Sequence, residues 1–254
     1  MFEFLFLGTG AADWDIKNRN GFFRRNSAAL VNNNLMIDCG SHIFDFANEY
    51  GNRELYSSVS DIIITHSHSD HFCKHSVLKI AQNQKIRLGC DGNIKNIIGE
   101  NENIEFVVFE PYKQVHMGEY IITPLLANHD VVARGDCYAF HYIIETGGKK
   151  IFYGLDGAWL LRPTWQEMKN HKFDLMIFDC TVGDSHDWRI FEHNTIPMLR
   201  AMVKEIAQQN LLNQNGRLVA SHLARTLHGS HEQTERILAE LDMLTAYDGM
   251  KLNL

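Results

Sequence analysis

Thr65-His66-Ser67-His68-Ser69-Asp70-His71 places three histidines and one aspartate within seven residues. The stretch follows a run of three isoleucines, which is typical of a buried strand. In an extended backbone His66 and His68 point to the same side, whereas Asp70 and His71 lie around the following bend. Imidazole and carboxylate groups suit zinc, iron and other borderline metals. The stretch therefore predicts a metal site at the end of a strand.

The bulk composition is that of an ordinary globular protein. The 254 residues are 45% hydrophobic and 22% charged, which is enough for a sizeable core, and we expect a single domain over residues 1–254. A net charge of −7 argues against a basic surface that grips nucleic acid. Five scattered cysteines without a C-x-x-C pair argue against a disulfide framework or a cysteine zinc site and favour a reduced, cytoplasmic setting. No apolar run approaches the length that would span a membrane.

The hydrophobic pattern alternates between strands and helices, which predicts a layered α/β fold. The expected strands cover residues 2–7, 27–31, 35–37, 61–65, 86–90, 105–109, 120–126, 138–145, 150–153, 174–178 and 217–220. The expected helices cover residues 41–50, 76–82, 93–98, 195–212 and 231–241.

Other residues that can bind metals also follow predicted strands. They are Asp38, His129, Asp156, Asp179 and His222. A sheet is rigid, and the loops at its strand ends can direct side chains toward one point. We therefore expect these residues to complete the site that the histidine-rich stretch begins.

These motifs, in this order, resemble those of the metallo-β-lactamase superfamily. The segment His-Ser-His-Ser-Asp-His resembles its H-x-H-x-D-H signature, and Asp38, His129, Asp156 and His222 resemble its remaining motifs. The resemblance covers almost the whole chain. It implies a four-layer αββα sandwich of two mixed β-sheets, with the metals at one edge.

The resemblance also implies a role for each candidate ligand. It assigns His66, His68 and His129 to a first metal, and Asp70, His71 and His222 to a second. Asp156 would bridge the two metals, and Asp38 would orient a ligand histidine. The cofactors would be two divalent ions, Zn²⁺ or Mn²⁺, with iron also suited to these donors. Two ions about 3.5–4 Å apart can share a hydroxide that attacks phosphorus or a carbonyl carbon.

The segment Phe191-Glu-His-Asn-Thr-Ile-Pro197 helps to choose between these reactions. His193 precedes a predicted helix that Asn194 or Thr195 can cap. This resembles the PhnP-like phosphodiesterase branch of the superfamily and, more distantly, the tRNA 3′-processing endonucleases (tRNase Z). The resemblance implies that His193 is a general acid for the leaving alkoxide. The candidate catalytic residues are therefore Asp70 and His193, and the expected reaction is hydrolysis of a small phosphodiester, cyclic ones included.

The sequence departs from these relatives in two places. The cysteine cluster that many PhnP-like proteins carry after the first Gly-Thr-Gly is missing, so a separate structural zinc is not expected. Its absence also weakens the expectation that this chain uses the same cyclic ribose phosphate substrate as those relatives. The long arm of tRNase Z is not visible either, which makes nucleic acid a less expected substrate without excluding a tRNA-type one.

Several loop residues near the motifs have open roles. Arg24 and Arg25 could contact a phosphate. His228 and His231 could line the pocket or belong to the start of the last helix. Five aromatic residues in loops could stack on a base or sugar: Trp14, Phe22, Phe23, Trp159 and Trp188.

Two other functions fit the same pattern. A carboxylic ester, lactone or thioester could be hydrolysed at the same metal site. A diiron redox or metal-sensing protein could use the same fold, although redox relatives usually need a flavodoxin-like partner domain and none fits within 254 residues. No membrane partner is expected, and a homodimer would match many of the relatives.

Overall fold

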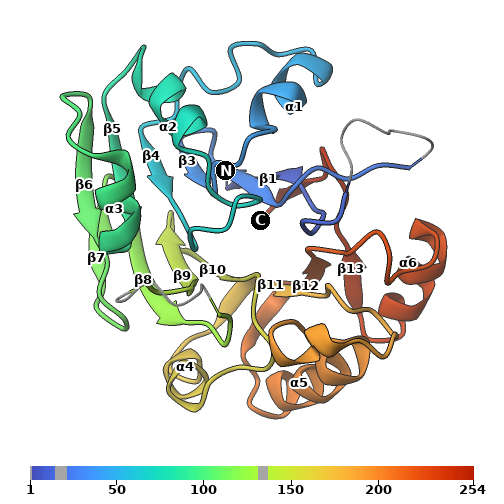
Figure 1. Cartoon of the computed structure of the whole chain (residues 1–254). Coiled ribbons are helices and arrows are strands. Elements are labelled where there is room, and N and C mark those ends of the chain that lie inside the picture. Colours follow the sequence, from blue (N-terminus) through green and yellow to red (C-terminus); the bar gives the residue numbers. More distant parts are fainter. Residues whose placement is uncertain (1, 15–21, 131–136) are drawn as a thin grey trace.

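The computed structural model of the chain describes residues 2–14, 22–130 and 137–254. Within these residues the strands form two seven-stranded sheets (Figure 1). The first sheet contains, in spatial order, β14 (Lys251–Asn253), β1 (Glu3–Gly8), β2 (Ala28–Val31), β3 (Leu35–Ile37), β4 (Asp61–Ile63), β5 (Ile86–Cys90) and β6 (Ile104–Val108). The second contains β13 (Met243–Thr245), β12 (Leu212–Ser221), β11 (Phe173–Asp179), β10 (Lys149–Gly154), β9 (Phe140–Thr146), β8 (Tyr120–Leu126) and β7 (Val115–Met117).

Six α-helices and one 3₁₀ helix connect the described strands. They are α1 (Ile43–Glu49), α2 (Lys74–Ala81), α3 (Gly92–Ile98), α4 (Arg162–Met168), η1 (Trp188–Phe191), α5 (Ile196–Gln208) and α6 (His231–Ala239). In Figure 1, α1 and α2 lie at the top of the view, and α4 and α5 lie at the bottom, with the sheets between them.

Alternation along β1 shows how the layers form. Phe4 and Phe6 are buried in the core between the two sheets, whereas Leu5 and Leu7 are buried in the core beneath α1, α2 and α3. A third core packs the second sheet against α4, α5 and α6. Each sheet mixes parallel and antiparallel pairs. The predicted αββα sandwich of two mixed sheets is confirmed.

The prediction of a helix through residue 212 is wrong. Helix α5 ends at Gln208, and β12 already begins at Leu212, five residues before the predicted strand. Asn210 has a φ of 52°, a left-handed conformation that ends a helix and that asparagine adopts more readily than most residues. Leu211 is buried at the position where the helical repeat places an apolar residue, so the pattern continued although the helix had ended.

Parallel pairing brings the motif-bearing strand ends to one edge. Strands β3 and β4 are parallel to each other, as are β10, β11 and β12. Hydrogen bonds join the two sheets near these ends, from Phe140 N to Thr65 O (2.9 Å) and from Leu223 N to Thr9 O (3.0 Å). The phenol of Tyr142 also donates to Ile64 O (2.5 Å). These contacts fix the distance between the candidate ligands that the two sheets supply.

No disulfide joins any of the five cysteines in the described part of the chain. Among the residues that the structure describes, no helix combines the length and the apolar character that crossing a membrane requires.

The packing between the sheets predicts that Gly89→Ala destabilises the fold. A Cβ at Gly89 would lie 2.3 Å from the ring of Phe109 and 2.9 Å from the sulfur of Met117, both of which are buried between the sheets. Such overpacking should lower the free energy of unfolding by about 1–3 kcal/mol, measured by urea denaturation. Gly92→Ala is the matched control, because a Cβ there meets no atom within 4 Å and the residue lies in α3. Equal unfolding midpoints for both variants would contradict this account.

Candidate metal centre

Three of the predicted site residues leave their strands in a left-handed backbone conformation. The φ angles are 62° at Asp38, 55° at Asp156 and 58° at His222. Each follows within two residues of the end of β3, β10 or β12. This conformation is uncommon for residues other than glycine, although aspartate, asparagine and histidine tolerate it best, and it concentrates at functional sites.

The first group of candidate ligands contains His66, His68 and His129. One ligand atom from each lies within 4.8 Å of the others, and His68 Nδ1 is 3.1 Å from His129 Nε2. His66 Nε2 is buried and has no hydrogen-bond partner among the described residues. Burial, together with the neighbouring His71, holds the pKa of His66 well below its usual range. The ring is therefore neutral and has a free lone pair, as a metal ligand requires.

The second group contains Asp70, His71 and His222. Asp70 Oδ2 lies 3.5 Å from His71 Nε2 and 3.6 Å from His222 Nε2, and the two nitrogens are 3.2 Å apart. Burial alone would raise the pKa of Asp70, but His71 and His222 lower it far below its usual range. Asp70 is therefore an ionised carboxylate that faces two imidazoles.

Asp156 lies between the two groups. Its Oδ2 is 2.8 Å from His71 Nε2 and 3.2 Å from His222 Nε2, while its Oδ1 is 3.9 Å from His129 Nε2. One carboxylate oxygen thus faces each group, which is the arrangement that a bridging ligand needs. The structure brings together all seven predicted ligands.

Two buried groups contact the Nδ1 atoms of two candidate ligand histidines. His71 Nδ1 lies 2.7 Å from Asp38 Oδ2, and Asp38 Oδ1 accepts from Thr65 N at 2.8 Å. His222 Nδ1 lies 2.7 Å from the hydroxyl of Thr181, which donates to His222 O at 2.9 Å. In both histidines the Nδ1 contact leaves Nε2 as the ring nitrogen that faces the cluster. Asp38 was predicted from the sequence, but Thr181, which follows Asp179 by two residues, was not.

The donor set fits divalent ions. Five imidazoles and two carboxylates form overlapping groups that could hold metal ions, and zinc, manganese and iron all accept such ligands.

His193 lies against this cluster. Its ring stacks on His222 with centroids 5.5 Å apart and planes 13° apart, and its centroid is 5.0 Å from that of His129. His193 Nδ1 is 2.7 Å from Asp179 Oδ2. Burial by itself would lower the pKa of His193, but the Asp179 carboxylate raises it to about 9. His193 is therefore positively charged near neutral pH.

The pairing of Asp179 with His193 was not predicted. In the sequence, Asp179 was only one more carboxylate at a predicted strand end. Its Oδ1 accepts from Thr181 N at 2.7 Å, which fixes the carboxylate at the end of β11. The two residues are 14 positions apart in a loop without a regular repeat, so spacing gives no sign that they meet.

Arg24 and Arg25 are buried and bonded to protein groups. Arg24 donates to Thr9 Oγ1 (2.6 Å) and to Ala246 O (2.5 Å). Arg25 donates to Asp248 (3.2 Å). These contacts hold the chain after β1 to the C-terminal segment, and they give no support to a role in phosphate binding.

The two histidines with open roles also contact protein groups. His228 Nε2 lies 2.7 Å from Cys180 O. His231 is the first residue of α6, and its Nδ1 is 3.0 Å from Arg24 Nη2. For His231, the structure agrees with the reading as the start of the last helix.

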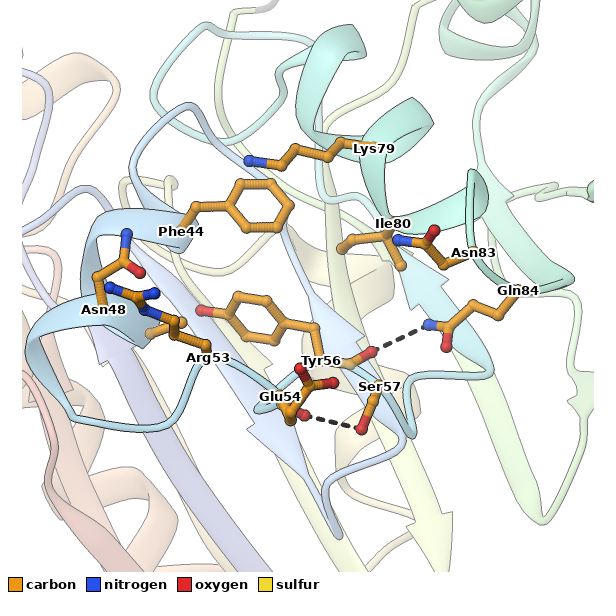
Figure 2. Close-up of a pocket in the computed structure, with 11 residues that line it drawn as sticks. Phe44, Asn48, Arg53, Glu54, Tyr56, Ser57, Lys79, Ile80, Asn83 and Gln84 are labelled. Carbon is orange, nitrogen blue, oxygen red and sulfur yellow. Dashed lines mark hydrogen bonds between the residues drawn. The ribbon is translucent and has the colours of Figure 1, made fainter.

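A surface pocket of about 440 Å³ lies between α1 and α2, on the outer side of the first sheet (Figure 2). Phe44 lies between Lys79, whose Nζ is 3.9 Å from its ring centroid, and Tyr56, which meets it edge-on. Gln84 donates to the carbonyls of Tyr56 and Val59. None of the predicted site residues lines this pocket, so concavity alone does not locate the metal centre.

Solved structures of known proteins share this fold. Zinc-bound PqqB from Methylobacterium extorquens has a TM-score of 0.77 at 15% identity, covering 99% of this chain and 100% of that one. A diphosphatase from the PhnP family has a TM-score of 0.74 at 14% identity, covering 100% and 98%. The short form of human tRNase Z has a TM-score of 0.68 at 17% identity, covering 99% and 98%. At such identities the likeness shows the fold alone.

Sequence comparison identifies the family. No curated protein gives a significant match to the chain. A family model does match it, that of the beta-lactamase superfamily domain, over residues 33–223. Since this match covers more than half of the sequence, the chain belongs to the β-lactamase superfamily, in agreement with the resemblance to its metal-dependent members.

Proposed function

We propose that the chain, acting as one domain, is a metal-dependent phosphodiesterase that cleaves small phosphodiesters. Membership of a superfamily of metal-dependent hydrolases supports hydrolysis in general. The observation that carries the finer proposal is the pair of His193 and Asp179 beside the cluster of metal ligands.

We assign the ligands to two ions. His66, His68 and His129 would hold the first, Asp70, His71 and His222 would hold the second, and Asp156 would bridge them. When bound, divalent ions of this kind neutralise charge on a phosphate group and activate water for attack.

His193 supplies the proton that the leaving oxygen needs. Asp179 occupies Nδ1, so Nε2 is the ring nitrogen that can donate to an alkoxide. Asp179 also keeps the ring protonated, because its negative charge stabilises the imidazolium. Sugar alkoxides are poor leaving groups, and their departure depends on such a donor. A good leaving group, such as nitrophenolate, depends on it much less.

The named relatives are consistent with phosphate chemistry. Two of the similar structures are, by their names, a diphosphatase and a tRNase. The net charge of −7 favours a small substrate over a long polyanion.

Metal-dependent turnover tests the proposal directly. Chelator-stripped protein should not hydrolyse bis(p-nitrophenyl) phosphate, and reloading with Zn²⁺, Mn²⁺ or Fe²⁺ should restore hydrolysis, because the ions supply the activated water. Metal content should be measured on the same samples. Fully loaded protein that cleaves no diester but cleaves carboxylic esters or lactones would replace the phosphodiesterase proposal.

Asp38→Asn should weaken metal binding about 10- to 100-fold, as is typical when the partner of a ligand histidine is changed. The amide has the same shape as the carboxylate but carries no negative charge, so it makes His71 a weaker metal ligand. Competition with a chromophoric chelator measures this loss without reference to turnover. Asp45→Asn is the control, because Asp45 lies at the surface on α1. Unchanged metal affinity in Asp38→Asn would remove Asp38 from the site.

His193→Ala should discriminate between leaving groups. Hydrolysis of 2′,3′-cyclic AMP, which expels an alkoxide, should fall about 10²- to 10⁴-fold, whereas hydrolysis of bis(p-nitrophenyl) phosphate should fall much less. His116→Ala, on the exposed face of β7, is the matched control. Equal losses on both substrates, with metal content intact, would show that His193 does not act as the proton donor.

A further inference from the structure

Large aromatic side chains are exposed on two loops beside the proposed metal centre. Trp159, three residues after Asp156, is 46% exposed. Trp188 and Phe191, just before His193, are 68% and 76% exposed. Each of these rings leaves apolar surface in water, and such surface, when it gathers in one place, marks a binding site.

Hydrogen bonds tie these loops to each other and to a metal ligand. Trp159 N donates to the side chain of Asn194 at 2.8 Å. The amide of Asn128 donates to Ala158 O at 2.6 Å. His129 Nδ1 lies 3.3 Å from Glu192 O. The aromatic loops and the proposed ligand His129 thus form one connected unit at the edge of the sandwich.

The two exposed aromatic residues of the short helix η1 are three positions apart. Residues at positions i and i+3 of a 3₁₀ helix lie above one another, which places Trp188 and Phe191 on the same face. Asp187 caps the helix through Arg189 N at 2.9 Å and also pairs with the guanidinium of Arg189 at 2.7 Å. His193 N in turn donates to Arg189 O at 2.8 Å. The aromatic face is therefore one turn away from the proposed proton donor, on a constrained backbone.

The backbone at Trp159 is also constrained. Its φ is 53°, a left-handed conformation that is strained for a bulky residue, and the hydrogen bond to Asn194 holds it there. Strain that persists at an exposed tryptophan beside a candidate active site points to a role for that side chain in binding.

We propose that Trp159, Trp188 and Phe191 form an aromatic platform that stacks on a nucleobase, so that the substrates are phosphodiesters of nucleosides. This inference rests on the proposed function, because Trp188 and Phe191 belong to the short helix that hydrogen-bonds to His193 N, and His193 is the proposed donor to the leaving oxygen. Stacking on an aromatic ring needs no positive charge, which suits a chain of net charge −7, and it accepts every base. Loss of one stacking residue typically weakens binding about 5- to 150-fold.

The first test measures binding without turnover. Titration calorimetry on metal-loaded protein compares AMP with ribose 5-phosphate, which carries the same phosphate but no base. We expect AMP to bind at least tenfold more tightly, and we expect this preference to shrink at least fivefold in Phe191→Ala and in Trp159→Ala. Tyr50→Ala is the matched control, because Tyr50 is a 42% exposed aromatic residue at the end of α1. Equal affinities for the two ligands in the wild-type protein, or a preference that survives both substitutions, would overturn the inference.

The second test separates this inference from the proposed function. It compares hydrolysis of 2′,3′-cyclic AMP with that of the base-free methyl riboside 2′,3′-cyclic phosphate, which has the same reacting group. The platform is supported if the wild-type protein prefers the nucleotide and Phe191→Ala loses that preference through a higher KM for the nucleotide. Equal cleavage of both substrates overturns the platform but keeps the phosphodiesterase. Tighter binding of AMP without cleavage of any diester keeps the platform and rejects the phosphodiesterase.

Sedimentation equilibrium tests the other occupant of an apolar face, a second copy of the chain. A dimer that Phe191→Ala dissociates, with the preference for AMP unchanged, would assign these rings to self-association and overturn the inference. An unchanged association state together with a reduced preference for AMP supports the platform.

Discussion

The buried carboxylate of Asp38 holds the centre of the structure together. It accepts hydrogen bonds from the backbone and hydroxyl of Thr65 and lies 2.7 Å from His71 Nδ1. Burial raises the pKa of this carboxyl group, and His71 and Thr65 oppose that effect. One fully buried group thus joins the end of β3 to the loop that carries four candidate ligands. It acts together with backbone hydrogen bonds from Cys39 N to His71 O (2.8 Å) and from Cys73 N to Cys39 O (2.9 Å), which hold the same loop to the end of β3.

The second constraint is that both sheets contribute candidate ligands. The histidine-rich loop leaves the first sheet, whereas His129, Asp156 and His222 leave the second. Hydrogen bonds from Phe140 and Leu223 join the sheets close to these ends, so the core between the sheets also sets the ligand geometry. The left-handed residues at the strand ends show the same dependence. Strain at these positions persists only because the surrounding packing and hydrogen bonds compensate for it.

The bounds of some helices and strands could be predicted from the sequence, and those of others could not. Strands β3, β5 and β8 have the predicted bounds, since strong apolar runs between turn residues mark them. The end of α5 was placed four residues too far, because Leu211 continues the helical repeat after Asn210 has turned the chain. The three-residue strands β7, β13 and β14 and the short helix α4 were not predicted. Strand β3 is equally short but consists of three apolar residues, whereas β7, β13 and β14 each include a polar residue and so leave no unbroken apolar run in the sequence.

The sequence by itself determined the class of the fold and the set of residues that gather at one edge. Metal-ligating side chains need particular atoms, so histidine and aspartate at strand ends are visible in a single chain. Tertiary structure alone decided how those atoms are oriented and which neighbours act on them. Three features depend on contacts between segments that are far apart in the sequence or separated by irregular loops. They are the pairing of Asp179 with His193, the hydroxyl of Thr181 next to His222, and the hydrogen bonds of Arg24 and Arg25 to protein groups. Such contacts have no period in the sequence, because distance and direction in three dimensions, rather than residue type and spacing, determine them.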